Sequence, residues 1–374
     1  MNNLHGILFA YRTTPELKDL TLHRTLASLP FGGRYRVIDF MLSSLVNAGV
    51  TDVGVIMHES YQSLLDHLGS GKDFDLARRS GGLKLLPPFA YSQNDRRTSS
   101  AVYHGTMDAL AGVYSYLQEI RQEYVILADA HTIVNIDVGA ILQAHIDSGA
   151  DITAVATSKP KSVSRDATYF IPDETGRVQE VLVGPASPSG LESINIYIMS
   201  KELMLKLTEY SAARDIVSLS AGILRPMVKD LKIIPYVYDG FAYRIQTVQG
   251  YYDISRKLLD PAVRAEVFAP ERPIRTKERN DAATYYAPSS KVRNSLLADG
   301  CIIEGTVENS IIFHNVRIGK GAVVKDSIVM QSSTIEDNAD LDCIIADKNV
   351  VVTSGTSLAG KATCPFVIAK GSKV

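Results

Sequence analysis

The residues of this chain that could carry chemistry are charged side chains placed next to short apolar runs. Asp129 comes just after the apolar run Tyr124–Leu127. Arg24 and Arg36 lie between the first apolar run and the first predicted helix. The eight histidines and three cysteines show no triad-like or zinc-ligand spacing. Nucleophilic catalysis by a Ser/His/Asp or Cys/His set is therefore not predicted.

Alternating strands and helices are expected to position these residues. The apolar run Ile7–Ala10 predicts a buried first strand, and a helix is predicted after a polar loop, between Val37 and Leu45. Further strands are predicted at 53–57, 124–127 and 152–157, an edge strand at 82–86, and helices at 61–68, 99–118 and 138–146. This alternation predicts an α/β domain with a largely parallel sheet. Its ligand should lie beyond the carboxyl ends of the strands.

The composition changes after Pro261, and the tail of the chain is repetitive. Repeats start at Asn294, Asn309, Asp326 and Asp342, which are 15, 17 and 16 residues apart, and apolar residues recur between them at about every sixth position. Short β-branched steps separated by Gly, Asn and Asp turns predict a parallel β-helix. The predicted domains are therefore 1–261, a linker at 262–282, and a β-helix at 283–374.

One segment resembles a known family. The run LPFGGRYRVIDFMLSSLVNAGV, residues 29–50, is similar to the first motif of glucose-1-phosphate adenylyltransferases (ADP-glucose pyrophosphorylases). The resemblance implies a nucleotidyltransferase-like, Rossmann-type sheet and a left-handed β-helix, which the run NSLLADGCIIEGTVENSIIF also resembles. It further implies chemistry that joins ATP and glucose 1-phosphate with the help of Mg²⁺ and releases pyrophosphate.

The family's phosphate-binding residues are missing. Tyr11-Arg12 stands where the family has two glycines, which a backbone needs in order to approach a phosphate closely. Glu16 replaces the arginine that meets the triphosphate, and Leu26 replaces the motif lysine. Gly184 replaces the lysine that holds the sugar phosphate. The resemblance therefore implies that the shape of the family is kept while its phosphate cradle is lost.

The family's two magnesium-binding aspartates are also replaced. The first falls on Ala130 and the second on Arg244, whose charge repels the cation that the aspartate would hold. A local slip of the chain that brings Asp129 or Asp137 to the metal stays open as an alternative. Loss of one preorganised electrostatic group typically costs about 10²–10³ in rate. Because both magnesium-binding aspartates are replaced, no cofactor and no metal site are predicted.

Two remnants of ligand binding are predicted from the resemblance. The first is a nucleotide-binding remnant made of Gln93, Gly105, Thr106 and Asp108, although Gly105-Thr106 could equally begin a helix with Thr106 as its N-cap. The second is an allosteric site for a sugar phosphate, AMP, sulfate or phosphate, made of His23, Arg24, Arg36 and Arg317. The alternative for these arginines is a role in ordinary ion pairs. His104, His131 and His314 are interpreted as ordinary surface or core residues.

Composition narrows the class of protein. A hydrophobic share of 45%, a charged share of 21% and a net charge of −2 indicate a globular protein with a sizeable core. They give no reason to expect a nucleic acid or an anionic membrane as partner. Neither a signal peptide nor an apolar run of membrane-spanning length is present in the sequence. With an odd number of cysteines, a cytoplasmic protein is expected.

The resemblance thus predicts a regulatory, catalytically impaired subunit. Its expected partner is the catalytic GlgC subunit of bacterial glycogen synthesis, in homo- and hetero-oligomers. An active adenylyltransferase with rearranged ligands is the main alternative. A hexapeptide acyltransferase is a weaker alternative, because such enzymes usually need a catalytic histidine and His314 is the only one in the tail.

Overall fold

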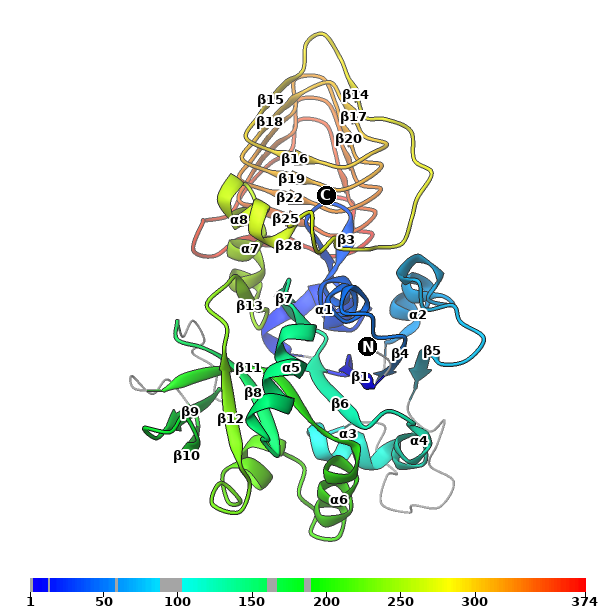
Figure 1. Ribbon diagram of the computed structural model, residues 1–374. Helices are drawn as coiled ribbons and strands as arrows, with labels where there is room; N and C mark the ends of the chain where they lie inside the picture. Colours follow the sequence, from blue (N-terminus) through cyan, green and yellow to red (C-terminus); the bar gives the residue numbers. More distant parts are fainter. Residues whose placement is uncertain (1–2, 13, 58–59, 88–102, 160–166, 185–189) are drawn as a thin grey trace. The chain divides into compact units, whose positions relative to one another are not determined.

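Figure 1 shows a computed structural model of the chain, which describes residues 3–374 except 13, 58–59, 88–102, 160–166 and 185–189. The chain forms two compact units, and neither is continuous in sequence. The sheet unit comprises Met1–Arg12, Phe40–Arg244 and Pro270–Arg275. The β-helix unit comprises Thr13–Asp39, Ile245–Ala269 and Thr276–Val374.

These units differ from the domains predicted at 1–261 and 283–374. The segment Thr13–Asp39 belongs to the β-helix unit, where its Arg24 forms an ion pair with Asp347. The predicted linker at 262–282 is also wrong in part, because α8 (Pro261–Val267) occupies its start. Proline is favoured in the first turn of a helix, so Pro261 begins this helix instead of ending an element.

Nine strands of the described residues form the main sheet of the sheet unit. They are β1 (Leu4–Phe9), β4 (Asp52–Ile56), β5 (Gly82–Leu86), β6 (Tyr124–Asp129), β8 (Ile152–Thr157), β9 (Thr168–Pro172), β10 (Val178–Val183), β11 (Leu191–Ser200) and β12 (Ile233–Val237). The order is β10-β9-β11-β6-β1-β4-β5, and β8 pairs with both β11 and β12. Strands β5, β4, β1 and β6 are parallel, as predicted, and β5 forms an edge. Strand β11 runs antiparallel to β6 and β8, so the sheet as a whole is mixed.

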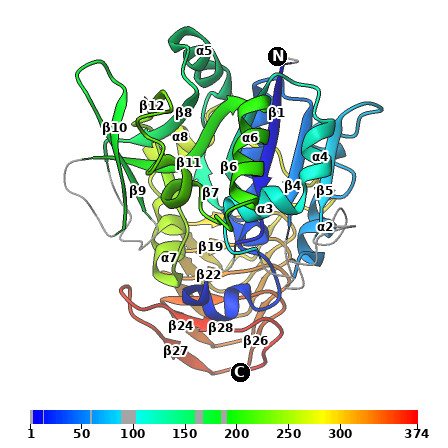
Figure 2. The same ribbon diagram turned by 90° about the horizontal axis from the view of Figure 1, so that it is seen from below.

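Helices cover both faces of this sheet. Figure 2 shows α3 (Thr106–Gly112), α4 (Tyr114–Glu119) and α6 (Lys201–Ala212) side by side over β6 and β1. Their apolar side chains share one core with the sheet. The helix predicted at 99–118 is thus two helices in its described part, separated at Val113. On the other face, a side chain at Gly6 would collide with Leu45 of α1 (Val37–Asn47). The remaining helical segments of this unit are α2 (Gln62–Leu68), α5 (Val138–Ser148), η3 (Lys72–Phe74) and η4 (Ser220–Leu224).

The β-helix unit contains three parallel sheets of five strands each. The first is β14 (Tyr285–Tyr286), β17 (Ile302–Ile303), β20 (Arg317–Ile318), β23 (Thr334–Ile335) and β26 (Val351–Val352). The second is β15 (Lys291–Arg293), β18 (Thr306–Glu308), β21 (Val323–Lys325), β24 (Asp340–Asp342) and β27 (Ser357–Ala359). The third is β16 (Leu296–Leu297), β19 (Ile311–Ile312), β22 (Ile328–Val329), β25 (Ile344–Ala346) and β28 (Phe366–Ile368). Inward-facing aliphatic residues of all three fill its core, which confirms the predicted β-helix.

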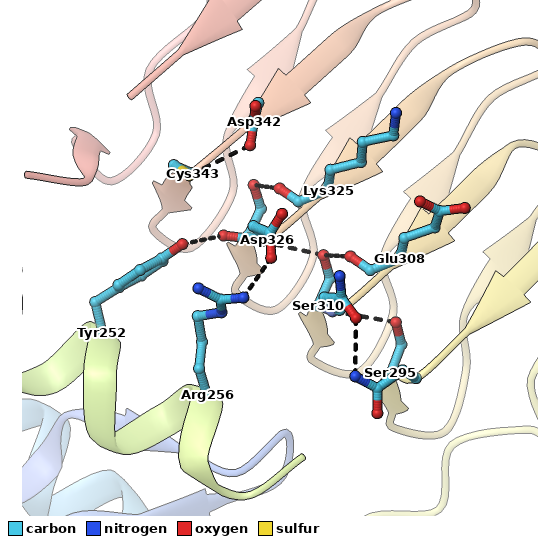
Figure 3. Close-up of polar contacts among 12 residues, drawn as sticks. Tyr252, Arg256, Ser295, Glu308, Ser310, Lys325, Asp326, Asp342 and Cys343 are labelled. Atoms are coloured by element: carbon cyan, nitrogen blue, oxygen red, sulfur yellow. Dashed lines mark hydrogen bonds and ion pairs between the residues drawn. The ribbon is translucent and has the colours of Figure 1, made fainter. Parts of the chain in front are cut away.

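A column of serine hydroxyls joins successive coils at one corner (Figure 3). The hydroxyl of Ser295 accepts a hydrogen bond from the backbone N–H of Ser310, and that of Ser310 accepts one from Ser327. The preceding residues Asn294, Asn309, Asp326 and Cys343 have left-handed backbones, which Asn and Asp tolerate better than most residues. The fourth repeat therefore begins at Cys343, and the spacings are 15, 17 and 17 residues. The predicted start at Asp342 was wrong because cysteine gives no turn signal.

Short segments complete each of the two units. The β-helix unit includes α7 (Val248–Lys257), η1 (Pro15–Thr21), η2 (Leu26–Ser28) and the hairpin β2 (Pro30–Phe31) with β3 (Tyr35–Arg36). In the sheet unit, β7 (Thr132–Val134) pairs with β13 (Ala242–Arg244). Among the described residues, no helix combines the length and apolar character that crossing a membrane requires.

Candidate functional site

A pocket of about 260 Å³ lies at the carboxyl ends of β1 and β6, where open α/β sheets bind their ligands. Arg12 comes shortly after β1, and Asp129 is the last residue of β6. The pocket is lined by Phe9, Arg12, His104, Gly105, Thr106, Leu127, Asp129, Val183, Asn195, Tyr197 and 218–221. Alternation along β6 places Asp129 on the pocket side together with Leu127.

Asp129 is the centre of charge in this pocket. Its carboxylate oxygens lie 3.5 Å from Nε of Arg12 and 3.7 Å from Nη2 of Arg244. It also accepts a hydrogen bond of 2.8 Å from the side-chain amide of Asn195. Burial alone would raise its pKa, but Arg12, His131, Arg244 and this hydrogen bond outweigh burial and hold the pKa at about 2. The carboxylate is therefore ionised and neutralised by guanidinium groups of its own chain.

His131 orients one of the two arginines. Nε of Arg244 donates a hydrogen bond of 3.0 Å to Nε2 of His131. Burial lowers the pKa of His131 to about 3, opposed by Asp129 and assisted by Arg244 and Arg12. The imidazole is thus neutral at pH 7 and free to accept from Arg244, so the arginines supply the positive charge around Asp129. His131 is buried, as one of the two alternatives of the sequence interpretation, a core residue, requires.

The residues around Asp129 do not fit a magnesium ion. Arg244, at the family's second metal-ligand position, lies against the carboxylate and would repel a cation. Asp137 is the N-cap of α5 and accepts a 3.0 Å hydrogen bond from the backbone N–H of Ala140. Ala130 is fully buried. Within the part of the chain that the structure describes, no group of three or more His, Cys, Asp or Glu could hold a metal ion.

Asn195 is a pocket residue that sequence reasoning missed. It lies in an irregular stretch of β11, where the pairing with β8 shifts register between Ser193 and Ile196. Its φ of 58° is in the left-handed region, which asparagine adopts more readily than most residues. A β-bulge re-aims side chains, and here the amide reaches Asp129. The only sequence signal was an asparagine inside an apolar strand.

The degenerate positions of the phosphate cradle differ in burial and packing. Tyr11 is buried, and its ring packs edge-on against Phe9 and Tyr103 at centroid distances of 6.0 and 5.6 Å. A bulky ring there prevents the close backbone approach that glycines give. Glu16 is exposed in η1, whereas Leu26 is buried in η2. Gly184 follows β10 with a φ of +143°.

The predicted nucleotide-binding remnant is described in part. Gly105 and Thr106 line the pocket, while Asp108 accepts a 2.9 Å hydrogen bond from the backbone N–H of His104. Gly105, not Thr106, is the N-cap of α3, and a side chain there would lie 2.2 Å from the carbonyl of Val217. Packing alone therefore requires this glycine. Gln93 lies outside the described residues.

A second charged cluster lies within the β-helix unit. Arg24 is buried and forms an ion pair with Asp347. Burial, then Arg36 and Arg24, lower the pKa of the neighbouring Lys348 to about 6. Burial and then Arg279 lower the pKa of His314 to about 4, with Lys348 and Arg36 adding to the effect. The cluster therefore gathers several basic groups around the buried carboxylate of Asp347, in a poorly solvated place.

The predicted anion-binding residues are only partly brought together. Arg24 and Arg36 belong to this cluster, but the guanidinium of Arg24 is engaged by Asp347. His23 is exposed. Arg317 pairs with Glu304 at 3.2 Å on an exposed face of the β-helix. Sequence reasoning missed Lys348 and treated His314 as ordinary, although both ring nitrogens of His314 are buried without a hydrogen-bond partner among the described residues.

Comparisons with known proteins agree with the two folds. Residues 13–232 match the family model described as nucleotidyl transferase, and residues 282–362 match the GlmU-like C-terminal hexapeptide model. The chain is 34% identical over 371 residues to the glycogen biosynthesis protein GlgD of Bacillus subtilis, covering 99% of this chain and 96% of that protein. The chain belongs to the GlgD family of nucleotidyl transferases. The hexapeptide match also agrees with the left-handed coil predicted for the β-helix.

Other relatives of the chain include a second GlgD protein and a glucose-1-phosphate adenylyltransferase. The chain is 35% identical to the GlgD protein of Geobacillus stearothermophilus, covering 86% of this chain and 83% of that protein. It is 33% identical to the glucose-1-phosphate adenylyltransferase of the same organism, covering 86% and 82%. The predicted family resemblance is thus confirmed. These similarities show a nucleotidyl transferase-family protein related to glycogen biosynthesis.

Proposed function

We propose that this chain is a regulatory, catalytically impaired subunit that acts on a catalytic glucose-1-phosphate adenylyltransferase (GlgC) in glycogen biosynthesis. The observation that carries the proposal is the state of Asp129. In a working site of this family carboxylates would face Mg²⁺ and substrate phosphates. Here those positions are Ala130 and Arg244, and the carboxylate that does face the pocket, Asp129, is neutralised by Arg12 and Arg244. Transfer of a nucleotidyl group depends on positioning and on charge neutralisation by metal and basic groups. The pocket therefore favours neither the positioning of a nucleotide nor the neutralisation of its charge.

A subunit without turnover acts through its partner. It changes the partner's rate only if it binds two conformations of that partner unequally. The names of the relatives, GlgD and glucose-1-phosphate adenylyltransferase, support a catalytic adenylyltransferase as the partner. The hetero-oligomer is then the functional unit, and the pocket of this chain catalyses no step of the reaction.

The experiment is an assay of ADP-glucose formation from ATP, glucose 1-phosphate and Mg²⁺. The isolated chain is expected to show no turnover, against about 1–10³ s⁻¹ for an ordinary enzyme. Mixing with the catalytic subunit is expected to raise its rate or change its response to effectors, and to form a larger particle by light scattering. Turnover by the isolated chain would establish the alternative of an active enzyme. Unchanged kinetics and separate particles on mixing would contradict the regulatory role.

We also propose that the cluster around Lys348 is an anion site through which regulation acts. Burial and the charges of Arg36 and Arg24 lower the pKa of Lys348 to about 6, so the amine is mostly neutral at pH 7. An anion bound beside it would raise that pKa, so binding takes up a proton. His314 offers buried ring nitrogens without partners among the described residues. A sugar phosphate, AMP, or inorganic sulfate or phosphate has the required charge.

Sulfate is expected to stabilise the chain by mass action, by about 5 °C in Tm at a concentration a hundred times Kd. The effect should be larger at pH 6 than at pH 8, because Lys348 is charged below its pKa of about 6. Lys348→Met should abolish the response without lowering Tm in the absence of sulfate, since it removes a poorly solvated amine. Lys361→Met, at an exposed lysine, is the matched control. An equal sulfate response in Lys348→Met would place the site elsewhere.

A further inference from the structure

One exposed face of the β-helix carries an ordered charge pattern. In each of the three middle strands of the sheet β15-β18-β21-β24-β27, the central residue lies in the core (Val307, Val324 and Leu341), whereas Val292 at the centre of β15 is 39% exposed. The residues on either side of the central residue therefore point outward and form two columns along the coil axis. Figure 3 shows Glu308 and Lys325 of one column pointing away from Tyr252 and Arg256 of α7.

The two columns share one symmetry of charge. Strand register stacks Arg293, Glu308, Lys325 and Asp342 in the first column, so the signs alternate from positive to negative. The second column stacks Lys291, Thr306, Val323 and Asp340, so its ends carry opposite signs and its middle is neutral. The fifth rung, from β27, adds only the uncharged Ala359 and Ser357. The four rungs from β15 to β24 reverse their signs when they are inverted about the point between β18 and β21. The face is therefore complementary to an inverted copy of itself.

Two copies placed face to face about a two-fold axis parallel to the strands realise this match. Such an axis sets Arg293 against Asp342, Glu308 against Lys325, and Lys291 against Asp340 of the other copy. Because successive strands are separated by a constant step of about 4.8 Å, one axis aligns all three kinds of pair at once. An axis parallel to the coil would instead set Lys291 against Arg293 and Asp340 against Asp342. Only the antiparallel arrangement is electrostatically favourable.

The charges are open to a partner, although the carboxylate of Asp342 also accepts a hydrogen bond of 3.3 Å from Sγ of Cys343. Arg293, Lys325, Asp340 and Asp342 are exposed. None of the charged residues of the two columns forms an ion pair with another residue that the structure describes. Lys291 and Asp340 lie three coils apart, so they cannot pair with each other in one chain. A ladder that merely stabilised its own chain would not need the second column to follow the same inversion.

We propose that this face is an isologous dimer interface that takes a second copy of the same chain in antiparallel orientation. This interface goes beyond the proposed regulatory role and uses none of the residues of the pocket or of the anion cluster. Five strands span only about 20 Å, so the contact is small against stable interfaces of about 1,200–2,000 Å². The dimer is therefore expected to be concentration-dependent and weakened by salt, as exposed ion pairs are.

The test is sedimentation equilibrium of the full chain at low salt. Lys325→Glu converts two attractive pairs per dimer into two repulsive ones, and an exposed pair changes affinity by a factor of about 1.5 to 5. The dimer Kd is therefore expected to rise about tenfold or more. The double variant Glu308→Lys/Lys325→Glu restores opposite charges across the two-fold axis and should recover most of the affinity. Lys373→Glu makes the same change in charge away from this face and should leave Kd unchanged.

Several results would overturn this interface. A monomeric wild type at low salt would do so, as would a dimer that responds equally to Lys325→Glu and Lys373→Glu. Failure of the double variant to recover would indicate that the charges act within one chain, where the exchange brings no gain. A complex with the catalytic subunit that is sensitive to Lys325→Glu, formed by a chain that does not self-associate, would assign the face to another partner. The assay of regulation is separate, so either proposal can fail alone.

Discussion

Asp129→Asn is expected to lower the free energy of unfolding by about 3 kcal/mol. The substitution removes the negative charge that lies between Arg12 and Arg244 and leaves two guanidinium groups next to each other. Breaking a buried pair by removing one partner costs about 3–5 kcal/mol. The lower end applies because 29% of the Arg12 side chain is exposed. Urea unfolding followed by circular dichroism measures the loss.

The difference in stability between the wild type and this variant is expected to change with pH in one direction. The pKa of Asp129 is lowered to about 2 from its ordinary 3.8, which corresponds to about 2 kcal/mol. A lowered pKa in the folded state contributes stability above the unfolded value, and that stability is lost as pH falls through about 2. The difference between wild type and Asp129→Asn should therefore shrink between pH 4 and pH 2.

Two further variants separate the charge effect from loss of packing. Asp129→Asn/Arg244→Gln should recover part of the lost stability, because it also removes one of the opposed cations. Asp147→Asn changes an exposed carboxylate in the same unit and should stay within about 0.5 kcal/mol of the wild type. A loss for Asp129→Asn no larger than for Asp147→Asn would mean that the arginines are solvated and that the network contributes nothing.

The second large effect is a failure to regain catalysis. Ala130→Asp/Arg244→Asp puts carboxylates back at both family metal positions, yet turnover is expected to stay at least about 10³-fold below 1 s⁻¹. Ala130 is fully buried and Asp129 takes the side of β6 that faces the pocket, so a carboxylate at position 130 does not enter it. Arg12 still neutralises Asp129, and Tyr11 still fills the place of a glycine.

Measurement of ADP-glucose formation tests this variant, with a catalytic adenylyltransferase as the positive control. Because a buried aspartate at position 130 could prevent folding, Arg244→Asp alone is assayed beside it, and circular dichroism checks both. Turnover within about tenfold of the positive control in either variant would contradict the expectation. It would show that the metal site was the single defect and that the altered phosphate loop is compatible with chemistry.

The sequence alone determined the architecture and the family. Hydrophobic runs and turn residues predicted the strands from Leu4–Phe9 to Ile152–Thr157, because burial along a strand and reversal at Gly, Asn or Asp are local properties. The β-helix followed from its repeat for the same reason, apart from the coil that begins at Cys343. Charge inversion at Arg244 was also visible without a structure, since the sign of a side chain needs no geometry.

Only the tertiary structure decided what those charges do. Asp129, Arg12 and Arg244 come from three segments far apart in sequence, and their mutual neutralisation depends on distances that no local pattern encodes. Lys348 and His314 looked ordinary in the sequence, because their perturbed pKa values arise from burial and from neighbours such as Arg36 that folding brings close. The domain boundaries failed for a related reason: Thr13–Asp39 joins the β-helix unit through long-range contacts rather than through chain order.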